Sequence, residues 1–282
     1  MSKRQNGTIS YEELLGFYAE AGVDTPLDDT AIDRFQQSAM MEKGAELDIR
    51  EAQSHPGKSG NLQRRIQNKV SPPSTLRISV DGQVATATEL AQNAKNLDEL
   101  YEALKSFNGC SLKLTAKNTC FADGTPNSRL MLIGEAPGRE EDLQGIPFVG
   151  RSGQLLNRIL AAIGLKRDDV YIANTIPWRP PGNRTPTPME TELCRPFIER
   201  QIELAGPKIL VALGGPAMQV LTGVKNGIIR TRGKWLSHKL KNGTAIPVMP
   251  TFHPAYLLRT PSQKKLVWVD FLEIRHALEQ LK

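Results

Sequence analysis

Several side chains that can do chemistry lie near the ends of short apolar runs in the second half of the chain. Glu135, Asn174 and His253 each lie at, or within two residues of, the end of such a run, and Phe148 lies in a glycine-flanked loop. An amide both donates and accepts hydrogen bonds, an imidazole donates to developing negative charge, and a carboxylate positions water or stabilises positive charge. Each residue also has a purely structural interpretation. Asn174 would cap a turn, Phe148 would belong to the core, Glu135 would be a solvated acid, and His253 would be a surface histidine. Their common placement favours a ligand site.

The apolar runs have the length and order of strands in a mainly parallel sheet. Strand-length runs alternate with helical patterns, which is typical of a sheet with helices on both faces. The expected strands cover 129–133, 170–174, 208–213 and 246–251, and the expected helices cover 153–163, 188–205, 215–223 and 266–281. Ligands bind at the carboxyl ends of such strands. The connection over 134–152 also exceeds the ~2–6 residues usual between a strand and a helix, which marks it as a functional candidate.

Three segments at these strand ends resemble the motifs of the family 4 uracil-DNA glycosylases. They are GEAPGREEDLQGIPFVGRSGQLL (134–156), YIANTIPWRPPGNRTPTP (171–188) and FHPAYLLR (252–259), and the resemblance covers about 108–282. It implies a three-layer α/β/α sandwich with a four-stranded, mainly parallel sheet. It also implies a base-excision repair enzyme that hydrolyses the N-glycosidic bond of deoxyuridine in DNA, releasing uracil and leaving an abasic site.

The resemblance also assigns a base pocket. The implied substrate-binding residues are Ala136, Phe148 and Asn174, and the implied catalytic residues are Glu135, Glu141 and His253. Asn174 suits uracil, because its amide can donate to O4 and accept from N3–H, a pattern that cytosine lacks. Phe148 would stack on the base, and Glu141 has the position thought to exclude the thymine methyl group. His253 would donate to uracil O2 as charge builds on the leaving base. The protonation state of His253, and which acid of 135–142 orients water, stay open at this stage.

Basic residues are concentrated in the C-terminal part of the chain. The formal net charge is +6, but residues 1–100 hold 11 basic and 15 acidic side chains, whereas residues 101–282 hold 25 and 15. Between 225 and 265 there are nine Lys or Arg and no Asp or Glu. This pattern favours a surface for a polyanion, with a solvated loop as the structural alternative. The candidate DNA-contacting residues are Asn183, Arg184, Arg230, Arg232, Lys234, Leu257, Leu258 and Arg259. Leu257 or Leu258 would fill the space that a flipped nucleotide leaves.

The cysteines depart from the family pattern. Family 4 enzymes typically hold a 4Fe–4S cluster, which normally requires four thiolates. By resemblance, Cys110 and Cys194 occupy two ligand positions, but the other two are Lys113 and Trp178, and Cys120 matches none. We therefore expect no cluster and no bound metal, with Trp178 filling the vacated volume.

The N-terminal part lies outside the resemblance. We expect residues 1–95 to form an extension with a short amphipathic helix at 10–22 followed by polar, linker-like sequence, and residues 96–282 to form the glycosylase domain. Helical patterning returns over 86–107, where Asn96 and Glu99 have capping spacing. No apolar run is long enough for a membrane span or a secretory signal, so we expect a cytoplasmic monomer that binds uracil-containing DNA.

Two other functions fit parts of the pattern. The first is a non-catalytic module that binds uracil or abasic DNA, since loss of cluster ligands can accompany loss of activity. The second is a phosphosugar or nucleotide enzyme of similar topology, which the absence of a GxGxxG or GxxxxGK[ST] motif disfavours.

Overall fold

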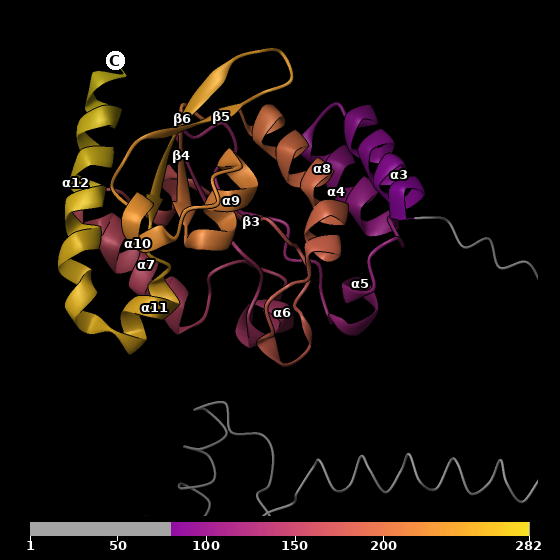
Figure 1. The fold of residues 1–282 in the computed structure, drawn as a ribbon, viewed down its shortest axis with the longest axis horizontal. Helices are drawn as coiled ribbons and strands as arrows, with labels where there is room; N and C mark the ends of the chain where they lie inside the picture. Colours follow the sequence, from indigo (N-terminus) through magenta and orange to yellow (C-terminus); the bar gives the residue numbers. More distant parts are fainter. Residues whose placement is uncertain (1–79, 282) are drawn as a thin grey trace, which may run out of the picture. The chain divides into compact units, whose positions relative to one another are not determined.

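The computed structural model describes residues 80–281, so the helix expected at 10–22 lies outside the described residues. Four parallel strands form the centre of one sheet (Figure 1). They are β2 (Leu130–Gly134), β3 (Tyr171–Asn174), β4 (Ile209–Leu213) and β6 (Ala245–Thr251). These are the four expected strands, and the mainly parallel α/β fold is confirmed. Two short edge strands that the sequence did not reveal, β1 (Asp123–Gly124) and β5 (Leu236–Lys239), pair antiparallel with β3 and β6 and bring the sheet to six strands.

The strand order creates a switch point next to β2. The sheet runs β1-β3-β2-β4-β6-β5, so the chain leaves β2 toward β3 on one side and continues with β4 and β6 on the other. In the register of β2 and β3, Gly134 lies opposite Asn174. The carboxyl ends of β2, β3 and β6 therefore open on one edge, where connections diverge and leave a crevice.

Helices cover both faces of the sheet. One face packs against α7 (Arg151–Ala162), α11 (Pro254–Arg259) and α12 (Lys264–Gln280), and the other packs against α8 (Pro188–Ala205) and α9 (Gly215–Thr222). The strands are buried on both faces, which explains their continuous apolar sequence. Three short helices, α5 (Leu112–Thr115), α6 (Arg139–Gln144) and α10 (Ile228–Thr231), lie in the connections. None of the helices within residues 80–281 has the length and apolar character that a membrane span requires.

Two helices cover the stretch over 86–107 where helical patterning and a cap at Asn96 were expected. Helix α3 (Val80–Asn93) and helix α4 (Leu97–Ser106) are separated by a break at which Asn96 caps α4, its Oδ1 accepting the Glu99 N–H at 2.8 Å. The expected capping pair is confirmed. Both helices pack on the side of α8 that faces away from the sheet and form a third apolar cluster there (Figure 1). The packed unit thus includes residues on the N-terminal side of residue 96, the boundary expected from the sequence.

Candidate active site

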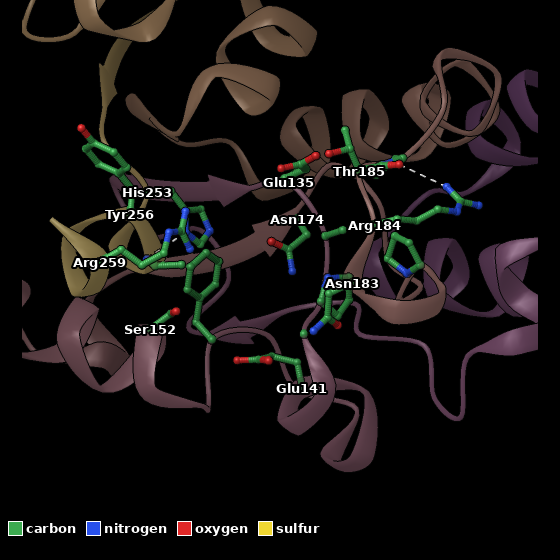
Figure 2. A pocket seen from close by; sticks show the side chains of 17 residues that line it. Glu135, Glu141, Ser152, Asn174, Asn183, Arg184, Thr185, His253, Tyr256 and Arg259 are labelled. Atoms are coloured by element: carbon green, nitrogen blue, oxygen red, sulfur yellow. Dashed lines mark hydrogen bonds between the residues drawn. The ribbon is translucent and has the colours of Figure 1, made fainter. Parts of the chain in front are cut away.

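A cavity of about 470 Å³ opens at the carboxyl ends of β2, β3 and β6 (Figure 2). The structure brings nine sequence-predicted residues to its lining: Glu135, Ala136, Glu141, Phe148, Asn174, Asn183, Arg184, His253 and Arg259. They come from segments that are far apart in the sequence and meet because parallel strands end at one edge. The cavity falls in the range usual for sites that enclose a small ligand.

Asn174 is the best-defined polar group in this cavity. Its side chain is buried at the end of β3, and Figure 2 shows it central among the labelled residues. The amide oxygen Oδ1 is buried and has no hydrogen-bond partner among residues 80–281. A Cβ atom on Gly134 would lie 2.4 Å from this oxygen, so only glycine leaves room for the amide there. A buried acceptor without a partner costs free energy unless a ligand supplies a donor, so Asn174 is poised to accept a hydrogen bond.

Phe148 is held beside the amide in a strained backbone conformation. Its φ of +54° is rare for a bulky side chain, and such strain persists only where the surroundings enforce it. Helix α7 starts so close that a Cβ on Gly153 would lie 1.7 Å from the Phe148 carbonyl oxygen. The Phe148 ring stacks with the His253 ring, with centroids 5.5 Å apart at 30°. The loop therefore fixes one aromatic face against the pocket.

Glu141 contributes to holding this loop. Its Oε1 accepts hydrogen bonds from the backbone N–H groups of Val149 at 3.1 Å and Gly150 at 3.0 Å, directly after Phe148. Its other oxygen, Oε2, lies where a Cβ on Gly138 would come within 2.8 Å. The carboxylate thus bridges α6 and the start of α7. The sequence analysis placed Glu141 as a catalytic residue and as a barrier to the thymine methyl group, and it gave no sign of these two bonds.

The acidic residues of the loop separate into distinct positions. Asp142 is buried and accepts the N–H groups of Lys117 and Asn118, and Glu140 is exposed and absent from the cavity lining. Glu135 lines the cavity, and burial raises the pKa of its carboxyl group. Its carboxyl group has neither a hydrogen bond nor an ion pair with the described residues. Of the acids that line the cavity, Glu135 is therefore the one whose carboxyl group is uncommitted.

The structure defines the protonation and tautomer of His253. The residue caps α11, and its Nδ1 accepts the Ala255 N–H at 3.1 Å. Burial, followed by the charge of Arg259, lowers the pKa of His253 to about 4. The imidazole is therefore neutral at pH 7. With Nδ1 acting as an acceptor, the proton lies on Nε2, which is the donor available to a ligand.

This lowered pKa has a measurable effect on stability. Between pH 6.5 and about 4, a histidine in the unfolded chain binds a proton that native His253 does not bind. The free energy of unfolding therefore gains a contribution that falls as pH drops through this window and is constant above it. Urea unfolding of wild type and His253→Gln at pH 7.5 and pH 5 should show a smaller acid loss in the variant. An equal loss in both proteins would contradict the pKa shift.

The structure corrects two of the predicted DNA contacts. Leu257 is fully buried in the core under α11 and is unavailable as a wedge, whereas Leu258 is 36% exposed. Arg232 forms an ion pair with Asp270 of α12 and donates to the Leu266 carbonyl, so its guanidinium is committed to the fold. Asp270, itself fully buried, also accepts the Thr251 hydroxyl at 2.5 Å. An Arg–Asp–Thr connection thus ties α12 to the end of β6, two residues before His253.

The remaining predicted contacts are accessible. Arg230, Lys234 and Arg259 are exposed, and Arg259 also reaches the cavity. Asn183 lines the cavity at a φ of +54°, and its Oδ1 accepts the Arg179 Nε–H at 2.7 Å. Arg184 is exposed but makes a two-pronged ion pair with Glu190 at 2.7 and 2.9 Å, so its guanidinium points away from Asn174 (Figure 2).

Sequence reasoning missed several cavity residues. Ser152, Thr185 and Tyr256 also line the cavity, together with Pro137, Gly138, Pro180, Pro186 and Ala255. Each lies within a motif but is flanked by residues with stronger chemical signals. A serine at a helix start and a tyrosine on a short amphipathic helix have ordinary structural roles, so their types alone carried no signal.

The donor set does not fit an iron–sulfur cluster. Cys110 and Cys194 are buried neighbours, but Lys113 and Trp178 offer no thiolate. Cys120 is buried elsewhere, its thiol 3.1 Å from the Glu141 carbonyl oxygen, and burial raises its pKa to about 12. No group of three or more His, Cys, Asp or Glu side chains within residues 80–281 is arranged to hold a metal ion. Two thiols are half of what such a cluster requires.

The fold and the cavity define an α/β protein that presents a polar pocket, with one aromatic wall, at the switch point of a mainly parallel sheet. Residues 121–273 match the uracil DNA glycosylase superfamily, and all four parallel strands and most of the cavity lining fall in this range. The chain belongs to this superfamily.

The chain is also similar to several type-4 uracil-DNA glycosylases. The chain is 43% identical over 167 residues to a type-4 uracil-DNA glycosylase of Thermotoga maritima, covering 58% of this chain and 83% of the relative. It is 38% identical over 184 residues to the type-4 enzyme of Archaeoglobus fulgidus, covering 64% and 92%. It is also 38% identical over 188 residues to that of Saccharolobus solfataricus, covering 65% and 87%.

Proposed function

We propose that this chain is a uracil-DNA glycosylase that hydrolyses the N-glycosidic bond of deoxyuridine in DNA, releasing uracil and leaving an abasic site for base-excision repair. The superfamily membership and the likeness to type-4 enzymes support this function. The observation that carries it is the buried Asn174 Oδ1, which has no partner among residues 80–281. Uracil offers this acceptor an N3–H, whereas cytosine presents a lone pair at the same ring position.

The base is held by shape and by one amide. The Asn174 Nδ2 donates to uracil O4 while its Oδ1 accepts from N3–H, and the fixed Phe148 ring stacks on the base. Ala136 lies beside Glu135 in the lining and supplies backbone contacts. A base reaches this pocket only after extrusion from the helix, which costs a few kcal/mol of unstacking. The exposed Leu258 fills the gap in the DNA and offsets part of that cost.

Bond cleavage places negative charge on the base and positive charge on the sugar. The His253 Nε2–H donates to uracil O2, where the negative charge develops, and it does so without a change of protonation. Glu135 is the carboxylate that positions the attacking water and stabilises the sugar cation, since the other nearby acids are committed or outside the cavity. Water adds to the sugar carbon and releases a proton to solvent, and the uracil anion takes a proton from solvent.

A single-uracil duplex provides the direct test. Full-length protein is incubated with end-labelled DNA that carries one uracil, and alkali then converts abasic sites to strand breaks. Alkali-labile breaks at the uracil and free uracil in solution are expected, with neither product from a matched thymine duplex. If the protein binds the uracil duplex but releases no base, the non-catalytic binding module is the correct function.

Substitution of Glu141 distinguishes a role in holding the Phe148 loop from a role as a barrier to the thymine methyl group. If it holds the Phe148 loop, Glu141→Leu removes two charge-assisted hydrogen bonds, worth about 1.5–3 kcal/mol each, and single-turnover uracil excision falls at least about tenfold. Glu141→Gln keeps an acceptor and is the matched control, with most of the rate expected to remain. If Glu141 acts mainly as a methyl barrier, Glu141→Ala, which removes its bulk, instead gains excision of thymine.

DNA binding is tested on the exposed basic residues. Arg230→Glu with Lys234→Glu should weaken binding to any DNA sequence and reduce the slope of log affinity against log salt by about two, since each phosphate contact contributes about 0.9. The control is Lys208→Glu, an exposed lysine at the amino end of β4, opposite the cavity. If the slope of log affinity against log salt is equal in the double variant and the control, Arg230 and Lys234 do not contact DNA.

The remaining expectations concern the assembly and the setting. The chain acts as a monomer on uracil-containing DNA, and the likeness to DNA glycosylases supports the DNA partner. It acts in the cytoplasm, supported by three cysteines that are free thiols. Residues 1–95 remain an extension to the glycosylase domain, although α3 packs with that domain.

A further inference from the structure

Trp178 is a fully buried member of the third apolar cluster. Its side chain is 1% exposed and packs among residues of α3, α4, α5 and the outer side of α8. The indole Nε1–H donates to the Thr119 hydroxyl at 3.0 Å, and the adjacent Cys120 N–H donates to the Pro177 carbonyl at 2.8 Å. Trp178 therefore joins the segment before β1 to the loop that follows β3.

Cys110 and Cys194, which occupy two of the four ligand positions of the family pattern, belong to the same apolar cluster. Cys110 and Cys194 are fully buried and hydrogen-bonded to each other, and both lie within the electrostatic influence of Glu190. Lys113, which occupies a third ligand position, is turned away from them. Its ammonium group donates to the Phe107 carbonyl at 3.1 Å, to the Asn108 side chain at 2.8 Å and to the Lys105 carbonyl. It thereby closes the C-terminal end of α4, where unpaired carbonyls favour a cation.

We propose that Trp178 takes the structural place of an iron–sulfur cluster, so that the chain is held together at this point by an apolar anchor and needs no metal. Where four cysteines are present, a cluster would cross-link these segments by bonds to each. Here the indole fills that position, with its only polar atom satisfied by Thr119. This proposal concerns the fold and holds whichever base the enzyme excises.

The anchor also supports the cavity. The loop after β3 that carries Trp178 goes on to Asn183 and Arg184, both of which line the cavity. Its far end is held by the ion pair of Arg184 with Glu190 of α8. The loop is thus fastened to α8 through the Trp178 cluster and through this pair. Weaker packing around Trp178 should therefore also displace Asn183, the DNA-facing residue that lies between Trp178 and the Arg184–Glu190 ion pair.

The metal content of the full-length protein is the first test. Anaerobically purified protein should contain no stoichiometric iron and show no absorbance near 400 nm, and treatment with a chelator and ferricyanide should leave the melting temperature unchanged. About four iron atoms per chain, with that absorbance, would overturn the proposal.

Substitutions of Trp178 provide the second test. Trp178→Ala should lower the melting temperature by about 10 °C and expose the loop after β3 to proteolysis, whereas Trp178→Phe, which keeps most of the volume, should lose much less. The control is Leu221→Ala, a buried leucine of α9 in a different cluster, which should lower the melting temperature without cleavage of that loop. If the loop after β3 resists proteolysis equally in Trp178→Ala and in the control, Trp178 does not anchor this loop.

Restoring the ligands is the third test and does not depend on the alanine variant folding. Lys113→Cys combined with Trp178→Cys recreates four cysteines around one position. After anaerobic reconstitution with iron and sulfide, this double variant should bind about four iron atoms and absorb near 400 nm, and Lys113→Cys alone should not. Failure of the double variant to bind iron would show that Trp178 does not occupy the cluster position.

Discussion

His253→Ala should lower the single-turnover rate of uracil excision by about 10²–10³-fold, while the affinity for uracil-containing DNA changes little. The neutral ring is fixed with Nδ1 on the Ala255 N–H, so Nε2–H is its only remaining donor. That hydrogen bond strengthens as the glycosidic bond breaks and charge moves onto O2. An interaction made mainly in the transition state affects the rate and not binding. His253→Gln, which keeps a donor at similar reach, should recover part of the loss.

The cap on α11 makes a stability control necessary. Loss of the Nδ1 acceptor is expected to cost about 1 kcal/mol of stability in His253→Ala, as for other helix caps. His238 is the matched control, because it is buried and its Nδ1 is hydrogen-bonded to the backbone carbonyl of Leu221, but it lies outside the cavity lining. His238→Ala should lose stability and keep its rate. A normal single-turnover rate in folded His253→Ala would remove His253 as the leaving-group donor.

Asn174→Ala should lower uracil excision at least tenfold. Removal of a hydrogen-bonding side chain from a desolvated pocket costs about 1–3 kcal/mol, and each ~1.4 kcal/mol is a factor of ten. Asn157→Ala, an exposed asparagine on α7, is the control and should keep the wild-type rate.

Asn174→Asp tests the direction of the amide. A protonated carboxyl group at this position can donate to cytosine N3 and accept from its N4 amino group, so selectivity should move toward cytosine as pH falls. Competition between uracil and cytosine duplexes at pH 5 and pH 7.5 measures this change. Unchanged kinetics in Asn174→Ala would remove Asn174 from the pocket.

Much of the fold was readable from the sequence because parallel strands buried on both faces are continuous apolar runs. Every end of the four central strands lies within one residue of the expected position. The edge strands were missed because β1 has two residues and β5, Leu236–Lys239, is polar and only partly buried. The start of α4 was predicted, because Asn96 and Glu99 have capping spacing, but the sequence did not show that α3 begins as early as Val80.

The candidate site could be read at strand ends, where topology alone brings residues together. Asn174 ends a strand, Glu135 and His253 follow strands, and all three line one cavity. Side-chain pairing cannot be read in this way. The sequence gives no sign that Arg232 pairs with Asp270, 38 positions away, or that Leu257 and not Leu258 turns into the core. Both depend on how α11 and α12 pack against the sheet.

The connection from Asp270 through Thr251 to the end of β6 affects how enzyme variants are interpreted. No residue of α12 lines the cavity, yet this helix holds the strand end from which His253 projects. A substitution or truncation that loosens the last helix will therefore displace the imidazole and slow excision from a distance. In a screen that scores activity alone, changes near the C-terminus will be mistaken for active-site lesions unless the melting temperature of each variant is measured beside its rate.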